Sequence, residues 1–302
     1  MWGIPSKHLL LLSLLLFILL SYTHYPSAET TTHDAPLMED DLNATVTLME
    51  GQLPLIISVP HGSLQLPATM PNRTSGQLIA DAYTISVGHQ LSHLLQQHYN
   101  AAPYVVILNV ARRKVDVNRP LDQACESPQT RRVWEHYHDV LQKTVDTVKK
   151  KYGHGLLLDI HGQAHKEGMV ELGYLLTSDT LRSKTDDSKL VQHSSLRSLA
   201  SRLETPDTLL RGNGSLGYAM MKGDDSVQVV PSPAHPAPRK ESLYFFGGYT
   251  TERYHTTLDV IQVETPKALR FSKEGRKLLS NRLAQGTIFM LDQYYLSDKS
   301  KL

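Results

Sequence analysis

Three polar side chains suited to metal or acid–base chemistry stand where short apolar runs of the sequence end. They are His61, His161 and Glu264. The runs before them cover residues 55–59, 156–160 and 260–263, and a glycine or proline follows each polar side chain within two positions. Open α/β sheets bind their ligands outside the carboxyl ends of their strands. The spacing therefore predicts that the three side chains converge at one edge of a sheet.

Two neutral imidazoles and a carboxylate are ligand types of a catalytic zinc site, which keeps its fourth position for water. A bound metal lowers the pKa of that water towards about 7, so a nearby carboxylate can act as general base in attack on an amide. A single histidine at a strand end more often has a structural role than a metal-binding one. For two histidines at matched strand ends, the two roles are equal alternatives. Asp159, two residues before His161, lies on the same face of a strand. There it either orients the imidazole or forms a buried ion pair with a basic residue.

A charged segment that follows the apolar run 104–110 has the chemistry to bind a carboxylate. In extended backbone it places Arg112, Asp116 and Asn118 on one face. Arg119 then faces the other way. Guanidinium groups bind carboxylates with two parallel hydrogen bonds, which favours a substrate site; the alternative is a solvated run of charges.

A second candidate for binding a carboxylate is Arg253, in the glycine-rich segment 247–255 that precedes the run ending at Glu264. The paired glycines Gly247 and Gly248 allow a ligand to approach the backbone closely. An ordinary glycine-rich turn is an equal alternative.

The elements that must position these residues alternate between strands and helices. Apolar β-rich runs occur at residues 55–59, 104–110, 156–160, 169–176 and 260–263. Helical periodicity occurs at residues 78–98, 129–152 and 273–295, the last with Ser272 as its N-cap. This order predicts an α/β fold with a mixed, mostly parallel central sheet that helices cover on both faces.

Composition excludes several other classes of function. The chain has 302 residues, a net charge of +1 and a single cysteine, Cys125. The balanced charge gives no electrostatic reason to expect a nucleic-acid partner. One cysteine excludes a disulfide framework and a cysteine-rich metal site, so a metal would be held by histidines and carboxylates.

The first 28 residues predict a targeting segment. The apolar run 9–20, interrupted only by Ser13, matches a signal peptide and falls short of the roughly 20 residues that a transmembrane helix needs. Ala28 is a candidate cleavage point, although an uncleaved signal anchor stays open as the alternative. Three glycosylation sequons begin at Asn43, Asn72 and Asn213. Together these features predict a glycoprotein of the secretory pathway, either secreted or anchored to a membrane by this segment.

The rest of the chain divides into a linker and one large domain. Residues 29–50 are rich in Thr, Asp and Glu and predict a flexible linker. Residues 51–302 then form the catalytic domain, and within it the Ser- and Pro-rich segment 178–238 predicts an elaborated loop over one side.

Six short motifs, taken together and in order, resemble those of the N-formylglutamate amidohydrolases. They are Pro60–Gly62, Asp81–Thr84, Arg112–Pro120, Asp159–Gly162, Gly247–Arg253 and Gln262–Glu264. The resemblance covers roughly residues 53–271. It implies a phosphorylase/hydrolase-like α/β fold, related to the zinc carboxypeptidases, and dependence on one zinc ion or another divalent metal ion.

The same resemblance implies roles for individual residues. His61 and His161 correspond to metal ligands, with Asp81 as the third. Glu264 corresponds to the general base. The second predicted catalytic residue, Asp159, comes from its place on the strand face and not from the resemblance. The resemblance implies that Asn118, Arg119 and Arg253 bind the substrate's carboxylate, and the chemistry of the charged segment adds Arg112 to these predicted residues.

The sequence thus predicts a zinc-dependent amidohydrolase that cleaves an N-acyl amide, or a C-terminal peptide bond, of a small carboxylated substrate. The alternative is a non-catalytic secreted glycoprotein that uses the same pocket to bind a ligand. No nucleic-acid partner is expected, and a membrane is expected only if the leader stays attached.

Overall fold

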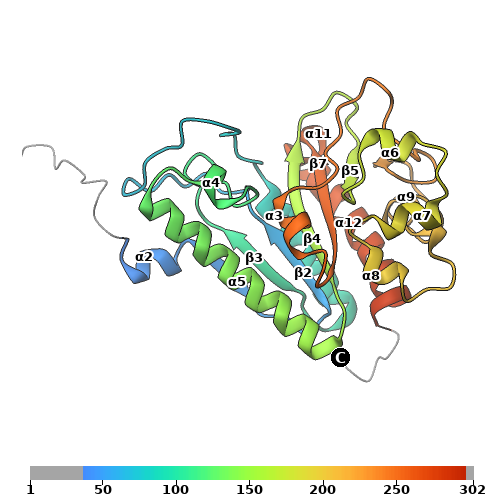
Figure 1. Cartoon of the computed structure of the whole chain (residues 1–302), viewed down its shortest axis with the longest axis horizontal. Helices are drawn as coiled ribbons and strands as arrows, with labels where there is room; N and C mark the ends of the chain where they lie inside the picture. The colour runs from blue at the N-terminus through green and yellow to red at the C-terminus, as the bar shows by residue number, and fades with distance from the viewer. Residues whose placement is uncertain (1–36, 297–302) are drawn as a thin grey trace, which may run out of the picture. The chain divides into compact units, whose positions relative to one another are not determined.

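A seven-stranded mixed sheet runs through the part of the chain that the computed structural model describes, residues 37–296 (Figure 1). Its spatial order is β1-β3-β2-β4-β7-β5-β6. The strands are β1 (Val46–Met49), β2 (Leu55–Val59), β3 (Tyr104–Leu108), β4 (Leu156–Gln163), β5 (Val170–Gly173), β6 (Val229–Val230) and β7 (Asp259–Pro266). The neighbours β3, β2, β4 and β7 are parallel, whereas β1 and β5 join them antiparallel. The predicted α/β fold with a mostly parallel mixed sheet is confirmed.

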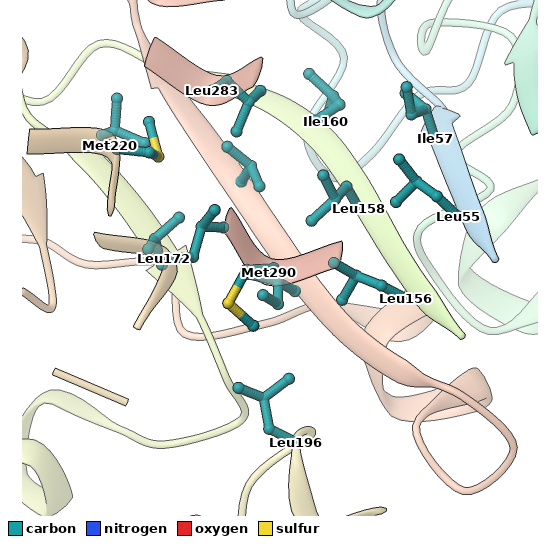
Figure 2. Close-up of a cluster of buried hydrophobic side chains, with 14 of the residues drawn as sticks. Leu55, Ile57, Leu156, Leu158, Ile160, Leu172, Leu196, Met220, Leu283 and Met290 are labelled. Carbon is teal, nitrogen blue, oxygen red and sulfur yellow. The ribbon is translucent and has the colours of Figure 1, made fainter. Parts of the chain in front are cut away.

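Helices cover both faces of this sheet because alternate strand residues point to opposite sides. On one face, Leu55, Ile57 and Leu158 belong to a core that includes α3 (Thr84–Tyr99) and α12 (Lys273–Met290). On the other face, Ile56 and Leu157 pack in a core with α5 (Pro128–Tyr152) and α10 (Tyr249–Tyr254). Figure 2 shows the first core, where strand leucines meet Leu283 and Met290 of α12. Burial on both faces explains the continuously apolar strands.

The long helices begin and end at capping residues. The Ser127 side chain accepts from the backbone of Thr130 at the start of α5, and Gly153 ends that helix with φ of 78°. Ser272 caps α12 as predicted, accepting from Gly275. The predicted helix over 78–98 is corrected at its start, since α3 begins at Thr84 after Tyr83, which has a left-handed φ of 70°. Residues 78–82 instead form a loop above the sheet.

The prediction of a flexible linker over 29–50 is wrong for its described part. Residues 39–43 form α2 (Glu39–Asn43), and β1 pairs antiparallel with β3. The acidic composition suggested a flexible segment. The helix and strand are instead held in place because Leu37 and Leu42 pack into the core on the α5 side of the sheet. The remaining linker residues and the leader over 1–28 lie outside the described residues. Within 37–296 no helix has the length and apolar character to cross a membrane.

The segment 178–238, predicted as a loop, carries several short helices. They are α6 (Ser178–Arg182), α7 (Asp187–Gln192), α8 (Arg197–Ala200), the 3-10 turn η1 (Pro206–Thr208) and α9 (Leu216–Met221). Polar caps such as Thr177, Asp186 and Ser215 start three of them. Leucines from these helices complete the α12-side core. The serines and prolines that suggested a loop are therefore caps and connections. The remaining elements are α4 (Leu121–Ala124), α11 (Lys267–Arg270) and the π-helical turn η2 (Leu291–Tyr295).

Candidate metal centre and active-site cavity

The carboxyl ends of β2, β4 and β7 bring the three strand-end side chains to one edge of the sheet. His61 follows β2, and the His161 and Glu264 positions pair directly across β4 and β7. The His61 and His161 rings lie with centroids 5.0 Å apart at an angle of 68°. The predicted convergence of the two imidazoles is confirmed.

Asp81, from the loop before α3, completes a group of three ligand atoms. Its Oδ2 lies 3.2 Å from Nδ1 of His161 and 3.6 Å from Nδ1 of His61. An ion held tetrahedrally at 2.0–2.1 Å separates its ligand atoms by about 3.3 Å, which matches this spacing. The three side chains are buried, and Nδ1 of His61 has no hydrogen-bond partner. A buried nitrogen without a partner, aimed at a carboxylate oxygen, fits a site for a metal ion. In the described part of the chain this is the group of histidine and carboxylate residues that could hold one.

Backbone contacts fix the position of Asp81. Its N–H donates to the carbonyl of His61 over 2.9 Å, and the hydroxyl of Thr84 donates to its carbonyl over 2.8 Å. The N–H of Gly162 donates to Oδ2 over 3.1 Å. The loop is thus bonded to both segments that carry the histidines, and the group is preorganised.

A second carboxylate holds the far nitrogen of each imidazole. Nε2 of His161 lies 2.9 Å from Oδ2 of Asp159, and Nε2 of His61 lies 2.8 Å from Oδ1 of Asp116. We assign the proton of each ring to Nε2, because an ionised carboxylate can only accept. In the neutral rings that a metal requires, this leaves both Nδ1 lone pairs facing Asp81, whereas in the metal-free protein the protonated His161 donates Nδ1–H to Asp81 over 3.2 Å. Of the two readings of Asp159, the structure shows the carboxylate that orients the imidazole.

Asp116 is a site residue that sequence reasoning placed on a strand face but did not assign a role. Residues 112–120 are turns and not extended backbone, so the predicted alternation is wrong. The turn lets Nε of Arg112 bond Oδ2 of Asp116 over 2.9 Å while Oδ1 bonds His61. Burial alone raises the pKa of Asp116, but His61 and Arg112 outweigh it and hold this pKa well below its ordinary value. The feature of the sequence that could have pointed to Asp116 is its position as an acidic residue within the basic segment 112–119.

We expect Asp116→Asn to weaken metal binding by about 10- to 100-fold, because the partners of metal-binding histidines typically contribute that much. The amide keeps the shape but no longer requires a proton on Nε2 of His61. Competition against a calibrated chelator measures the change. We call His61, Asp81 and His161 the metal group. The matched control is Asp122→Asn on α4, which lies outside this group. Equal affinities for the two variants would contradict the role of Asp116.

A cavity of about 600 Å³ opens over the metal group. This is within the range of small-molecule sites. Its wall includes Asp81, Arg112, Asn118, Arg119, His161 and Glu264. Glu264 lies in this wall with Oε1 accepting from Gln262 over 2.9 Å, and its Oε2 is buried with no partner. Burial raises the pKa of Glu264 to about 8, an effect that the nearby Asp81 carboxylate reinforces. A carboxylate so poised can exchange a proton near neutral pH.

Comparison with solved structures shows which fold this is. The structure matches N-formylglutamate amidohydrolase from Ralstonia eutropha with a TM-score of 0.50 and 14% identity, over 83% of this chain and 98% of that one. The chain has the fold of an N-formylglutamate amidohydrolase. A gene product of Agrobacterium tumefaciens matches with a TM-score of 0.49 and 11% identity, over 85% of this chain and 99% of that one. An N-acetylmuramoyl-L-alanine amidase from Clostridium difficile matches with a TM-score of 0.31 and 13% identity, over 80% of this chain and 98% of that one. No model of a known family and no curated protein sequence matches the chain.

Within this N-formylglutamate amidohydrolase fold, three of the four predicted carboxylate-binding residues reach the cavity. Arg112, Asn118 and Arg119 line it. Asn118 accepts the N–H of Thr250 through Oδ1, and its Nδ2 lies 3.4 Å from Nε2 of His161. Gly248 makes this possible, since a Cβ there would collide with the Asn118 side chain. The guanidinium of Arg112 forms ion pairs with Asp116 and, over 3.8 Å, with Asp81.

Arg253 does not reach the cavity, and its predicted role is corrected. The glycine pair leads directly into α10, which carries Arg253 to an exposed position outside the cavity wall. There its guanidinium lies over the rings of Trp134 and Tyr254, at 5.7 and 5.6 Å from their centroids. Its hydrogen bond to the hydroxyl of Tyr249 completes a cation–π contact of α10 with α5.

Metal binding to this group should release a proton and strengthen as pH rises. Burial lowers the pKa of His161, but Asp159, Asp81 and Glu264 outweigh it and raise this pKa well above the ordinary value of 6.5. A metal binds only the neutral imidazole, so it must displace the proton. Below the raised pKa we expect the apparent affinity to rise about tenfold per pH unit for one displaced proton. Chelator competition at several pH values measures it, and an affinity that does not change with pH would contradict it.

Proposed function

We propose that the protein is a metal-dependent amidohydrolase that cleaves the N-acyl amide bond of a small carboxylated substrate resembling N-formylglutamate. One observation carries the proposal. Three buried ligand atoms on His61, Asp81 and His161 converge to within 4.8 Å of one another, and Asp81 and His161 lie in the wall of a cavity. The same wall holds Glu264 with a carboxylate oxygen that has no partner. The candidate metal ligands, the candidate general base and a cavity for the substrate therefore occur at one place.

Zinc is the metal that we propose for this group. Two imidazole nitrogens and one carboxylate oxygen are a catalytic zinc donor set, so His61, Asp81 and His161 would hold the ion and leave a position for water. A divalent cation bound there supplies Lewis-acid polarisation of the amide carbonyl and lowers the pKa of water. Glu264 takes the proton from the attacking water through Oε2. Asp159 and Asp116 keep the imidazoles oriented throughout.

Arg119 and Asn118 are the residues that we propose to bind the substrate's carboxylate. Nη1 of Arg119 donates to the carbonyl of Asn118, and this guanidinium forms no ion pair with the described acidic residues. It therefore has donors left for a carboxylate. Arg112 contributes indirectly, since its guanidinium positions Asp116 and faces Asp81.

The test combines metal analysis with an activity panel. We expect protein purified under mild conditions to carry about one equivalent of zinc per chain, or to bind it on reconstitution. The zinc-loaded protein should release the free amine from at least one of the N-formyl, N-acetyl and N-succinyl derivatives of glutamate and other amino acids. Absence of a divalent metal would contradict the mechanism. Bound metal without turnover would favour the alternative of a non-catalytic binding protein.

We also propose that the protein enters the secretory pathway, as its leader and sequons predicted. The three sequon asparagines, Asn43, Asn72 and Asn213, are exposed, which supports glycosylation. Expression in a secreting eukaryotic cell tests this. A shift in electrophoretic mobility on treatment with a glycosidase would support the proposal, and a protein retained in the cytosol without glycans would contradict it.

A further inference from the structure

A second histidine–carboxylate pair lies in the cavity wall, apart from the metal group. His165 follows β4 and lines the cavity. Its Nδ1 lies 2.7 Å from Oε1 of Glu171, a buried residue of β5. The other oxygen of Glu171 accepts the N–H of Phe245 over 2.9 Å. Both oxygens of Glu171 thus accept, and we assign the donor to Nδ1–H of His165.

This arrangement leaves Nε2 of His165 as the atom available for chemistry. Nε2 makes no hydrogen bond with the described residues. The ring is held by Glu171 and by the ring of Phe245, whose centroid lies 4.8 Å away. A half-buried imidazole that a carboxylate orients through Nδ1 is the form in which enzymes use histidine to give or take a proton.

The register of the sheet places this pair beside the base and opposite the metal group. The Glu264 position pairs with His161 on one side and with Glu171 on the other. Because adjacent strands lie about 4.8 Å apart, Glu264 stands between the metal ligands and the His165–Glu171 pair. Through its bond to Glu171, His165 lies in the cavity wall on the side of Glu264 away from His161.

We propose that His165 is the general acid that protonates the departing nitrogen, with Glu171 as its positioning residue. The inference rests on the proposed amidohydrolase function. After Glu264 has taken one proton from water, the C–N bond breaks with its electron pair going to nitrogen. His165 gives its Nε2 proton to that nitrogen, and the amine leaves. Solvent reprotonates His165, and Glu264 returns its proton to water, so the net reaction converts one amide and one water into a carboxylate and an ammonium.

The other groups of the cavity wall suit this step less well. Arginine does not give up its proton in proteins, which excludes Arg112, Arg119 and Arg270. The side chain of Lys267 is exposed, with Nζ lying 5.2 Å from the centroid of the Phe271 ring. Imidazole is the side chain whose charge ordinarily changes near neutral pH.

The experiment compares two leaving groups in one variant. His165→Gln is assayed on the N-acyl amino acid that the wild type hydrolyses best, and on a 4-acyloxybenzoate carrying the same acyl group. A phenolate leaves without a proton, whereas an amide nitrogen does not. We expect kcat to fall by about 10²- to 10³-fold on the amide, in the range of general acid catalysis, and by less than about threefold on the ester.

Two further measurements separate catalysis from structure. Metal content, and the affinity for the product amino acid by calorimetry, should stay within about twofold of wild type. The matched control is His235→Gln, a half-buried histidine bonded to Gln228 outside the cavity wall, which should behave as wild type on both substrates.

Equal losses of His165→Gln on amide and ester would overturn the inference and leave the amidohydrolase proposal standing. A weakened product affinity with unchanged kcat would also overturn it, by making His165 a binding residue. Failure of the zinc-loaded wild type to hydrolyse any N-acyl amino acid would overturn both proposals together.

Discussion

Asp81→Asn is expected to reduce the affinity for zinc by more than about 100-fold and to abolish detectable hydrolysis. Loss of a direct ligand should exceed the 10- to 100-fold effect typical of the outer partners of metal ligands. The amide retains the size of Asp81 and can still accept the N–H of Gly162, so the loop should keep its position. It replaces a charged oxygen, 3.2 and 3.6 Å from the two imidazole nitrogens, with a neutral one.

Metal content after dialysis, and zinc affinity by chelator competition, measure this effect. The matched control is Asp41→Asn in α2, an exposed residue outside the metal group. Thermal denaturation of the metal-free proteins shows whether the variant is folded. One equivalent of zinc bound to Asp81→Asn with wild-type affinity would show that the metal, if any, lies elsewhere.

The parts of the site that could be predicted are those that depend on local periodicity. His61 and His161 were found because each ends an apolar run before a glycine, and parallel strands bring such ends together. Asp159 was found because strand side chains alternate. Helix α5 was predicted to within one residue, since its apolar period and caps are all local.

The parts that could not be predicted depend on contacts distant in sequence. Asp116 reaches His61 only because residues 112–120 turn, and the alternation expected of an extended segment does not predict that turn. Arg253 leaves the cavity because the glycine pair starts a helix. The His165–Glu171 pair is local, six positions apart, but its place beside Glu264 depends on the pairing of β5 with β7. Asp81 was identified through resemblance alone, because a helix was expected there and a loop before α3 places it.

Glu264→Gln is expected to lower kcat by about 10²- to 10⁴-fold, the range of general acid–base catalysis, while zinc content and KM stay near wild type. Glutamine fits the site, since its amide oxygen can accept from Gln262 as Oε1 of Glu264 does. It cannot take a proton from water. The control is Glu274→Gln, an exposed residue in the first turn of α12. Turnover of Glu264→Gln within about threefold of wild type would remove Glu264 as the base.

The stability of metal-free protein gives an independent check on the same residue. Burial raises the pKa of Glu264 from 4.5 to about 8. Between these values the folded state keeps a proton that the unfolded state releases, so this residue makes the free energy of unfolding fall as pH rises. The neutral amide of Glu264→Gln removes that contribution. Metal-free variant should therefore lose less stability than wild type between pH 5 and about 8 in denaturant titrations. If the free energy of unfolding changed with pH equally in the two proteins, Glu264 would already be ionised in the folded, metal-free state. Its pKa would then not be raised, which would contradict the role of Glu264 in taking and returning a proton.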